Sequence, residues 1–412
     1  MTISASLFLL FVLLKPFYIF PSGSIGIGDL AAGLCCLSLL LRRIRKKRWN
    51  LFYKQDCLLY LFVVCASVIN CIYYVIDPSV DFLKNTSFWI YSGMVIWCFR
   101  ELAEEKNFFI GLNLVLKFNI LLQFGIYVSG YGRIYYEYWD ASRYMGTFNN
   151  PNQMAYILFL IILLIYLYDI THHRKSFWMF FFIGGALILL TKSTGIFLGW
   201  MLLLVGTACT GLYTKFRDGR ISGKLILTMV AGTAAVCIIG LVLIWPEKGF
   251  VIQEENYNLI TRIQEKLALI SEGGVLQVII DRGGEKILYY PQYLLYGAGE
   301  GGFHRFPLAV VWKSEIHSTI FSVWFSYGLI PFTLLSAWVY NNLKKIDFLY
   351  WPVYAALFVE SMTVINYRQP FFWMILIYAG MRRQKDNDGR SNGKIQRMAE
   401  ERFNRSRING RA

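Results

Sequence analysis

The chain has 412 residues, of which 56% are hydrophobic, 17% aromatic and only 16% charged. Soluble domains average about 25% charged residues, whereas apolar runs of about 17–25 residues, which recur here, have the length of a helix that crosses a bilayer. The composition therefore excludes a chain of ordinary soluble domains and predicts an all-α polytopic membrane protein.

Twelve apolar runs are predicted to cross the membrane. They cover residues 2–20, 25–41, 57–76, 85–99, 107–130, 153–170, 177–190, 194–213, 225–245, 316–340, 348–365 and 370–381. With the N-terminus in the cytoplasm, cytoplasmic segments carry 27 Lys and Arg residues, and outer segments carry 12, seven of them in one long loop. Membrane proteins concentrate Lys and Arg in cytoplasmic loops. The net charge of +15 is therefore explained by topology, and no nucleic-acid partner is predicted.

The predicted spans divide the chain into four regions. Residues 1–245 hold spans one to nine, 246–315 form a long extracytoplasmic loop, 316–381 hold the last three spans, and 382–412 form a basic cytoplasmic tail. The N-terminus has neither a basic n-region nor a small-residue cleavage site, so a cleaved signal peptide is not expected. Eight cysteines lie within or beside the spans without metal-like spacing, so no disulfide framework, metal site or cofactor is predicted.

Polar residues interrupt the apolar pattern just before the sixth span, over residues 142–156, SRYMGTFNNPNQMAY. Asn150 and Pro151 are typical of a helix start, because Asn caps the first turn and Pro fits its first position. Arg143 is unusual, since short outer loops disfavour arginine. The surrounding tyrosines suit either the aromatic belt of a membrane protein or the stacking of sugar rings. This segment is predicted to be a helix start, the rim of a site, or both.

A very short turn, Lys192-Ser193-Thr194-Gly195, joins the seventh and eighth spans. It places one cation at the outer surface, and taken alone it is an ordinary connector.

The long outer loop is predicted to be partly helical. Residues 257–271 place apolar side chains on one helical stripe, and Gly273-Gly274 is expected to end that helix. A second, partly apolar segment follows. We expect these helices to lie over the outer mouth of the bundle.

The end of this loop combines glycines with histidine. The backbone can approach a ligand closely at Gly297, Gly299, Gly301 and Gly302. His317 opens the tenth span, where an imidazole can remove a proton near neutral pH, although taken alone a histidine in this position is more often an interfacial residue satisfied by hydrogen bonds. His304 is a competing candidate, while His172 and His173 are predicted to face the cytoplasm.

Under this topology Arg143, Lys192, Arg282 and His317 all lie on the outer face. Several cations and one base beside aromatic residues suit a substrate that contains a lipid-linked phosphate and a sugar.

The layout of the whole chain resembles the O-antigen polymerase and O-antigen ligase family. Three motifs carry the resemblance: Arg143 with GTFNNPNQMA (146–155), Ser193-Thr194-Gly195, and GAGEGGF…EIHS (297–318) followed by YGLIPF (327–332). It implies that His317 is the catalytic base and that Arg282 and Arg143 bind the donor pyrophosphate. It also implies substrate binding by Lys192, Asn152, Gly299 and Arg305. Two departures are Lys192, where relatives often have Arg, and Ser318, where Asn is common.

The resemblance implies metal-independent, inverting glycosyl transfer on the outer face of the bacterial cytoplasmic (inner) membrane. An O-antigen polymerase would join polyprenyl-pyrophosphate-linked repeat units, with undecaprenyl as the carrier, for lipopolysaccharide or capsule biosynthesis. A chain-length regulator protein is an additional partner consistent with the family. A ligase, which transfers the chain to lipid A-core, uses the same chemistry, and the spacing does not decide between them, although overall similarity favours the polymerase.

A polytopic transporter or flippase is the alternative of another class. Transporters place ionisable residues in mid-membrane and contain internal repeats. Few charges lie within or beside the spans here, namely Lys15, Lys117, Asp169 and Glu360, and the sequence assigns no role to Lys117 or Glu360.

Overall fold

Helices form most of the molecule, which a computed structural model describes over residues 1–20, 26–48, 52–136, 142–219, 222–223, 244–246, 257–308, 315–344, 346–378 and 380–381. The first part contains α1 (Ile3–Leu14), α2 (Ile27–Arg45), η1 (Lys54–Asp56), α3 (Cys57–Ile76), α4 (Val80–Ala103), α5 (Phe108–Val128), β1 (Arg133–Tyr136), β2 (Ser142–Gly146), α6 (Pro151–Thr171), α7 (Phe177–Leu190) and α8 (Thr194–Arg217). The second part contains α10 (Leu259–Asp281), α11 (Glu285–Tyr289), α12 (Tyr293–Tyr296), η4 (Phe303–Arg305), α13 (Thr319–Tyr327), α14 (Leu329–Leu343), η5 (Phe348–Tyr350), α15 (Trp351–Ser361) and a helix over 370–378.

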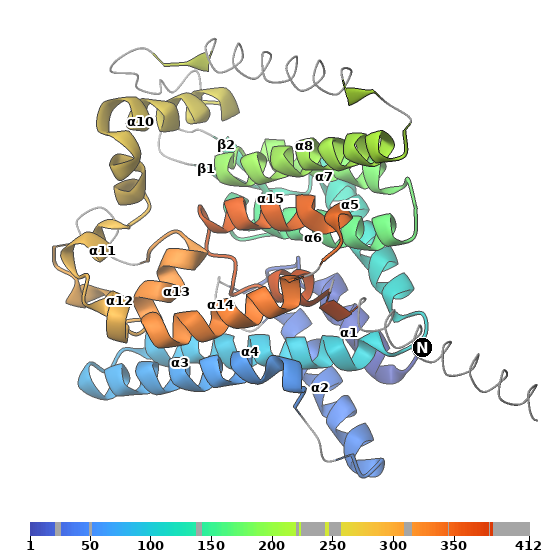
Figure 1. Ribbon diagram of the computed structural model, residues 1–412, viewed down its shortest axis with the longest axis horizontal. Helices are drawn as coiled ribbons and strands as arrows, with labels where there is room; N and C mark the ends of the chain where they lie inside the picture. Colours follow the sequence, from blue (N-terminus) through green and yellow to red (C-terminus); the bar gives the residue numbers. More distant parts are fainter. Residues whose placement is uncertain are drawn as a thin grey trace, which may run out of the picture.

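The long helices lie side by side, and α10, α11 and α12 gather at one end of them (Figure 1). This end is called the loop end below. The sixth helix, α6, is buried along nearly its whole length, because its side chains are apolar on all faces and α5, α7 and α8 pack around it.

Within the described residues, four helices are long and apolar enough to cross a membrane: Lys54–Ile76, Phe108–Val128, Pro151–Thr171 and Thr194–Arg217. Two shorter helices, Ile3–Leu14 and Phe177–Leu190, are also apolar. These helices support the predicted helical membrane protein. The count of twelve spans goes beyond this finding and stays a prediction, and most of the predicted ninth span and the tail after residue 381 lie outside the described residues.

The predicted tenth span, 316–340, is wrong as one continuous helix. It consists of α13 and α14, which meet at Gly328. Gly328 has a φ of +75°, and a Cβ there would lie 2.6 Å from the backbone nitrogen of Gly297. The glycine-rich loop therefore packs against the break, with Ala298 and Gly299 donating backbone hydrogen bonds to Phe325 and Ser326 at 3.0 and 2.8 Å.

The all-α prediction omitted a short antiparallel hairpin formed by β1 and β2. Tyr135 pairs with Arg143 and Ile134 with Tyr144, and an irregularity in the register follows Arg133. Four- and five-residue strands are too short to show a clear two-residue period in the sequence.

The structure confirms a helix over the predicted amphipathic segment of the long loop. α10 starts after Asn258, whose side chain caps Ile260 and Thr261, and it continues beyond the predicted end. Gly274, with a φ of 65° and a ψ of −165°, bends the helix where the sequence predicted a stop. The bend directs the second half of α10 toward α11 (Figure 1).

Candidate functional site

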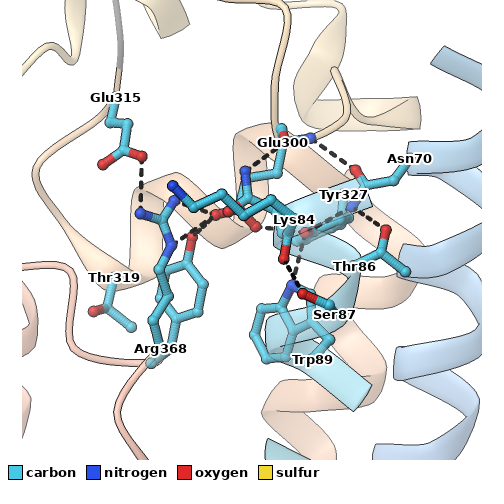
Figure 2. A network of polar contacts seen from close by, with 12 residues as sticks. Asn70, Lys84, Thr86, Ser87, Trp89, Glu300, Glu315, Thr319, Tyr327 and Arg368 are labelled. Atoms are coloured by element: carbon cyan, nitrogen blue, oxygen red, sulfur yellow. Dashed lines mark hydrogen bonds and ion pairs between the residues drawn. The ribbon is translucent and has the colours of Figure 1, made fainter. Parts of the chain in front are cut away.

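Glu300 is the centre of a buried polar network beneath the glycine-rich loop (Figure 2). Its side chain is only 3% exposed. Tyr327 donates a hydrogen bond to Oε2 at 2.6 Å, and Tyr367 donates to Oε1 at 2.5 Å. The backbone of Glu300 is also bound, because its N–H donates to Asn70 at 2.8 Å and its carbonyl accepts from Asn85 at 2.7 Å. These contacts attach the loop to α3, α4 and α13.

Arg368 connects this network to the start of the segment that leads into α13. Its Nε and Nη2 donate to Glu300, the former at 3.1 Å, and its Nη1 lies 2.8 Å from a carboxylate oxygen of Glu315 (Figure 2). A guanidinium shared by two carboxylates is held in one orientation by charge-assisted hydrogen bonds. Glu315 and the residues after it are thereby fixed against the core.

A small pocket lies beside this network, with a cavity volume of about 20 Å³. Its wall combines ionised and aromatic side chains with the backbone of the glycine-rich loop, and includes Lys286, Gly299, Glu300, Phe306, Glu315 and Arg368.

Lys286 is the unusual member of this wall. Its side chain is 2% exposed, and its ammonium lies 5.3 Å and 5.7 Å from the ring centres of Phe303 and Phe306. Among the described residues, no hydrogen bond or ion pair to Nζ is found. Burial lowers the pKa of Lys286 to about 8, against the opposing effect of Glu315 and Glu285.

His317 lies in the loop just before α13, and Ser318 caps that helix with a side-chain hydrogen bond from the Phe321 N–H at 3.5 Å. The backbone N–H of His317 donates to the Arg282 carbonyl at 2.7 Å, and Nδ1 lies 3.3 Å from the carbonyl of Glu315. Burial lowers the pKa of His317 below its ordinary value of 6.5; Glu315 opposes this shift, and the charges of Arg282 and Lys286 add to it. The imidazole is therefore neutral at pH 7, the state that can accept a proton.

Arg282 ends α10 and stands directly beside His317. Its Nη1 donates to the carbonyl of Thr363 at 3.1 Å, and its Nε lies 3.8 Å from Asp281. Burial and the positive charge of Arg262 lower its pKa, so a second arginine lies within electrostatic range. The structure thus brings the predicted base and one predicted phosphate ligand together.

Arg143, Asn152 and Lys192 form a second cluster at the loop end. Arg143 is 3% exposed and donates to the Thr191 carbonyl at 2.7 Å and to Asn152 at 2.6 Å. Lys192 donates to the carbonyls of Ser142 and Tyr257 at 2.7 and 3.1 Å. These bonds attach the hairpin to the α7–α8 turn and to the start of α10. The contacts of Arg143, Asn152 and Lys192 with a substrate stay a prediction.

The cluster of Arg143, Asn152 and Lys192 adjoins the pair of His317 and Arg282 through α10 and the segment after α15. Arg262 lies 5.6 Å from the ring centre of Tyr257, the residue whose carbonyl accepts from Lys192. A Cβ on Gly195 would lie 2.6 Å from Oγ1 of Thr363, whose carbonyl binds Arg282. The three sequence motifs therefore meet at one end of the bundle.

Gly299 and Arg305 both stabilise the glycine-rich loop. Gly299 has a φ of +69°, and a Cβ there would approach Tyr73 to 2.8 Å, so only glycine fits. Arg305 donates to the carbonyls of Ala298 and Gly301 at 2.5 and 3.1 Å and lies 4.4 Å from the ring centre of Tyr73. Gly299 lines the pocket, whereas the guanidinium of Arg305 is bound within the loop.

Sequence reasoning missed Lys286, Glu300, Glu315 and Arg368. Glu300 stands among four glycines, and Arg368 interrupts the apolar pattern between the last two predicted spans, as NYRQP. A charged residue in such surroundings is a signal that could have identified both. Lys286 carries no comparable local signal, because its burial depends on Phe303 and Phe306.

Two residues left unassigned by the sequence are also buried. Lys117 pairs with Asp169 at 2.8 Å. Glu360 is fully buried and accepts a hydrogen bond from Asn366. Neither contact reaches the pocket wall.

Within the described ranges, no group of three or more His, Cys, Asp or Glu side chains lies close enough to hold a metal ion. No protein-family model, curated protein or solved structure matches the chain. The functional interpretation therefore rests on the residues themselves and on their geometry.

Proposed function

We propose that the chain is a membrane glycosyltransferase of the O-antigen polymerase type. In this proposal twelve helices cross the bacterial cytoplasmic membrane, and the loop end faces the periplasm or exterior. The observation that carries the proposal is the placement of a neutral, half-buried His317 next to Arg282, one residue after Ile316 in the wall of the pocket.

The proposed reaction joins two glycans without a covalent enzyme intermediate. His317 accepts the proton of an acceptor hydroxyl while its oxygen attacks the anomeric carbon of a polyprenyl-pyrophosphate-linked donor. The bond from that carbon to the pyrophosphate oxygen breaks, and the leaving pyrophosphate takes the electron pair. Arg282 stabilises this charge, supported by the field of Arg262, which is the electrostatic contribution that usually dominates such steps. A single displacement inverts the configuration at the anomeric carbon.

The test compares His317→Gln with His304→Gln in the native host, with surface glycan and carrier-linked glycan separated by length. His304 is the matched control, because it lies in the same loop region with 71% of its side chain exposed and pairs with Asp77 at 3.1 Å. We expect the His317 variant to abolish long chains and the His304 variant to retain them.

The product pattern separates the alternatives. Lipid A-core with a single repeat unit indicates a polymerase, whereas bare core with long chains left on the carrier indicates a ligase. Unchanged long surface chains in His317→Gln at normal abundance would remove His317 from the mechanism and favour a transporter or flippase.

A further inference from the structure

We propose that the end of α2 is a binding site for an anionic phospholipid. The phosphate binds to four consecutive cations, Arg45, Lys46, Lys47 and Arg48, and the acyl chains lie along the apolar side chains that precede them. These four residues are called the basic end of α2 below. The inference concerns the lipid around the chain and does not depend on the proposed glycosyl transfer.

The first argument concerns the charge at the basic end of α2, where all four side chains are exposed. Just before it, Arg42 and Arg43 are paired with Glu105 and Glu101. In the part of the chain that the structure describes, no ion pair to the four later cations is found, and the sequence contains no Asp or Glu from residue 30 to 55. Four neighbouring positive charges without acidic partners create a local potential that attracts an anion.

The second argument is that the backbone holds these cations together. The N–H groups of Lys46 and Arg48 donate to the carbonyls of Arg42 and Arg43 at 3.1 and 3.0 Å. Lys47 has a φ of +53°, the left-handed conformation that commonly closes the last turn of a helix. The four positive charges therefore lie in one compact turn, where they can act on the same phosphate group.

The third argument is an apolar stripe that leads along α2 to its basic end. Leu34, Leu37, Leu41 and Ile44 follow one another at intervals of three and four residues, which places them on one side of the helix, and each is between 47% and 55% exposed. No residue of α2 after Leu39 is buried, and this part of the helix extends away from the other helices (Figure 1). A phospholipid matches both the stripe and the cations, whereas a soluble anion or a nucleic acid would contact only the cations.

The experiment measures lipid binding to the full-length protein by native mass spectrometry from neutral detergent micelles. Phosphatidylglycerol is the anionic probe, and phosphatidylcholine with the same acyl chains is the control. We expect the first phosphatidylglycerol to bind with an apparent Kd lower than that of phosphatidylcholine by a factor of about ten or more, because each cation near the membrane surface adds to the attraction of an anionic headgroup. Replacing all four residues of the basic end by glutamine should remove this preference.

The control variant removes the same positive charge from other turns of the chain. It combines Arg174→Gln and Lys175→Gln in the α6–α7 turn with Lys215→Gln and Arg217→Gln at the end of α8, and all four residues are exposed. Arg217 differs from the basic end of α2 in having an acidic neighbour, Asp218, at 4.0 Å. We expect the control variant to keep the preference for phosphatidylglycerol, and an equal loss of preference in both variants would show that only the net charge matters.

Three further results would overturn the proposal. The first is equal binding of the two lipids, or a preference that survives in the glutamine variant of the basic end. The second is loss of the preference in Lys46→Arg with Lys47→Arg, which retains both charges. The third is displacement of phosphatidylglycerol by sn-glycerol 3-phosphate or by a single-stranded oligonucleotide, which would assign the cations to a soluble phosphate or to a nucleic acid. Lipid binding is measured without turnover, so these results are independent of the His317 test.

Discussion

Replacing Lys286 by methionine should stabilise the folded protein while it removes the pocket's cation. The side chain is 2% exposed, and its pKa falls from the ordinary 10.5 to about 8. Each pKa unit corresponds to about 1.4 kcal/mol, so burial of the charged form opposes folding by roughly 3 kcal/mol at pH 7. The cation–π contacts with Phe303 and Phe306 offset part of this cost in the wild type. We therefore expect Lys286→Met to raise the free energy of unfolding by about 1–3 kcal/mol.

The pH dependence of the free energy of unfolding distinguishes removal of the buried Lys286 charge from better packing of the methionine side chain. Between pH 8 and 10.5 the unfolded state keeps the proton of Lys286 while the folded state loses it, so the stability of the wild type rises with pH across this window. Lys286→Met lacks this rise, and the two proteins should converge near pH 10.5.

The assay is equilibrium unfolding in mixed micelles from pH 7 to 11, with Lys106→Met, at an exposed lysine in the α4–α5 turn, as the control. A difference between wild type and Lys286→Met that stays constant over this range would refute the assignment of a buried, unpaired ammonium.

Two predictions concern residues that hold the glycine-rich loop in place beside the pocket, Glu300 and Gly328. Glu300→Gln keeps the shape of the side chain but leaves Arg368 paired with Glu315 alone, so it should lower the free energy of unfolding by about 1–3 kcal/mol in the same micelle assay; an unchanged value would show that the network contributes little. Gly328→Ala should destabilise by about 1–3 kcal/mol, because the residue has a φ of +75° and its Cβ would lie 2.6 Å from the nitrogen of Gly297. Gly125→Ala is its control, since an added methyl there meets nothing within 4 Å, and equal effects of the two changes on the unfolding midpoint would contradict the strain argument.

Local signals predicted the elements that depend on neighbouring residues. The predicted seventh span coincides with α7, and α6 begins with the expected Asn150 cap, which accepts from the Asn152 N–H, followed by Pro151. The bend of α10 at Gly274 also lies at the predicted glycine pair. Apolar period, capping and glycine geometry act within a few residues of the chain, and therefore a sequence pattern can report them.

Neither the break at Gly328 nor the roles of the cations could be derived in this way. The break depends on the close approach of Gly297, 31 residues earlier in the numbering. Arg143 and Lys192 carry the charge expected of phosphate ligands, but the folded chain binds them to backbone carbonyls of the α7–α8 turn, the hairpin and Tyr257. A sequence shows which groups can donate hydrogen bonds and does not show which acceptors folding brings to them.

The sequence by itself determined that the chain forms apolar helices with a partly helical long loop, because burial of apolar surface and satisfaction of backbone hydrogen bonds leave few other solutions in a membrane. Only the tertiary structure placed Glu300 against Asn70, 230 residues away, and surrounded Lys286 with aromatic rings. Burial and charge balance are properties of the assembled wall of the pocket. They exist only once segments far apart in the chain have come together.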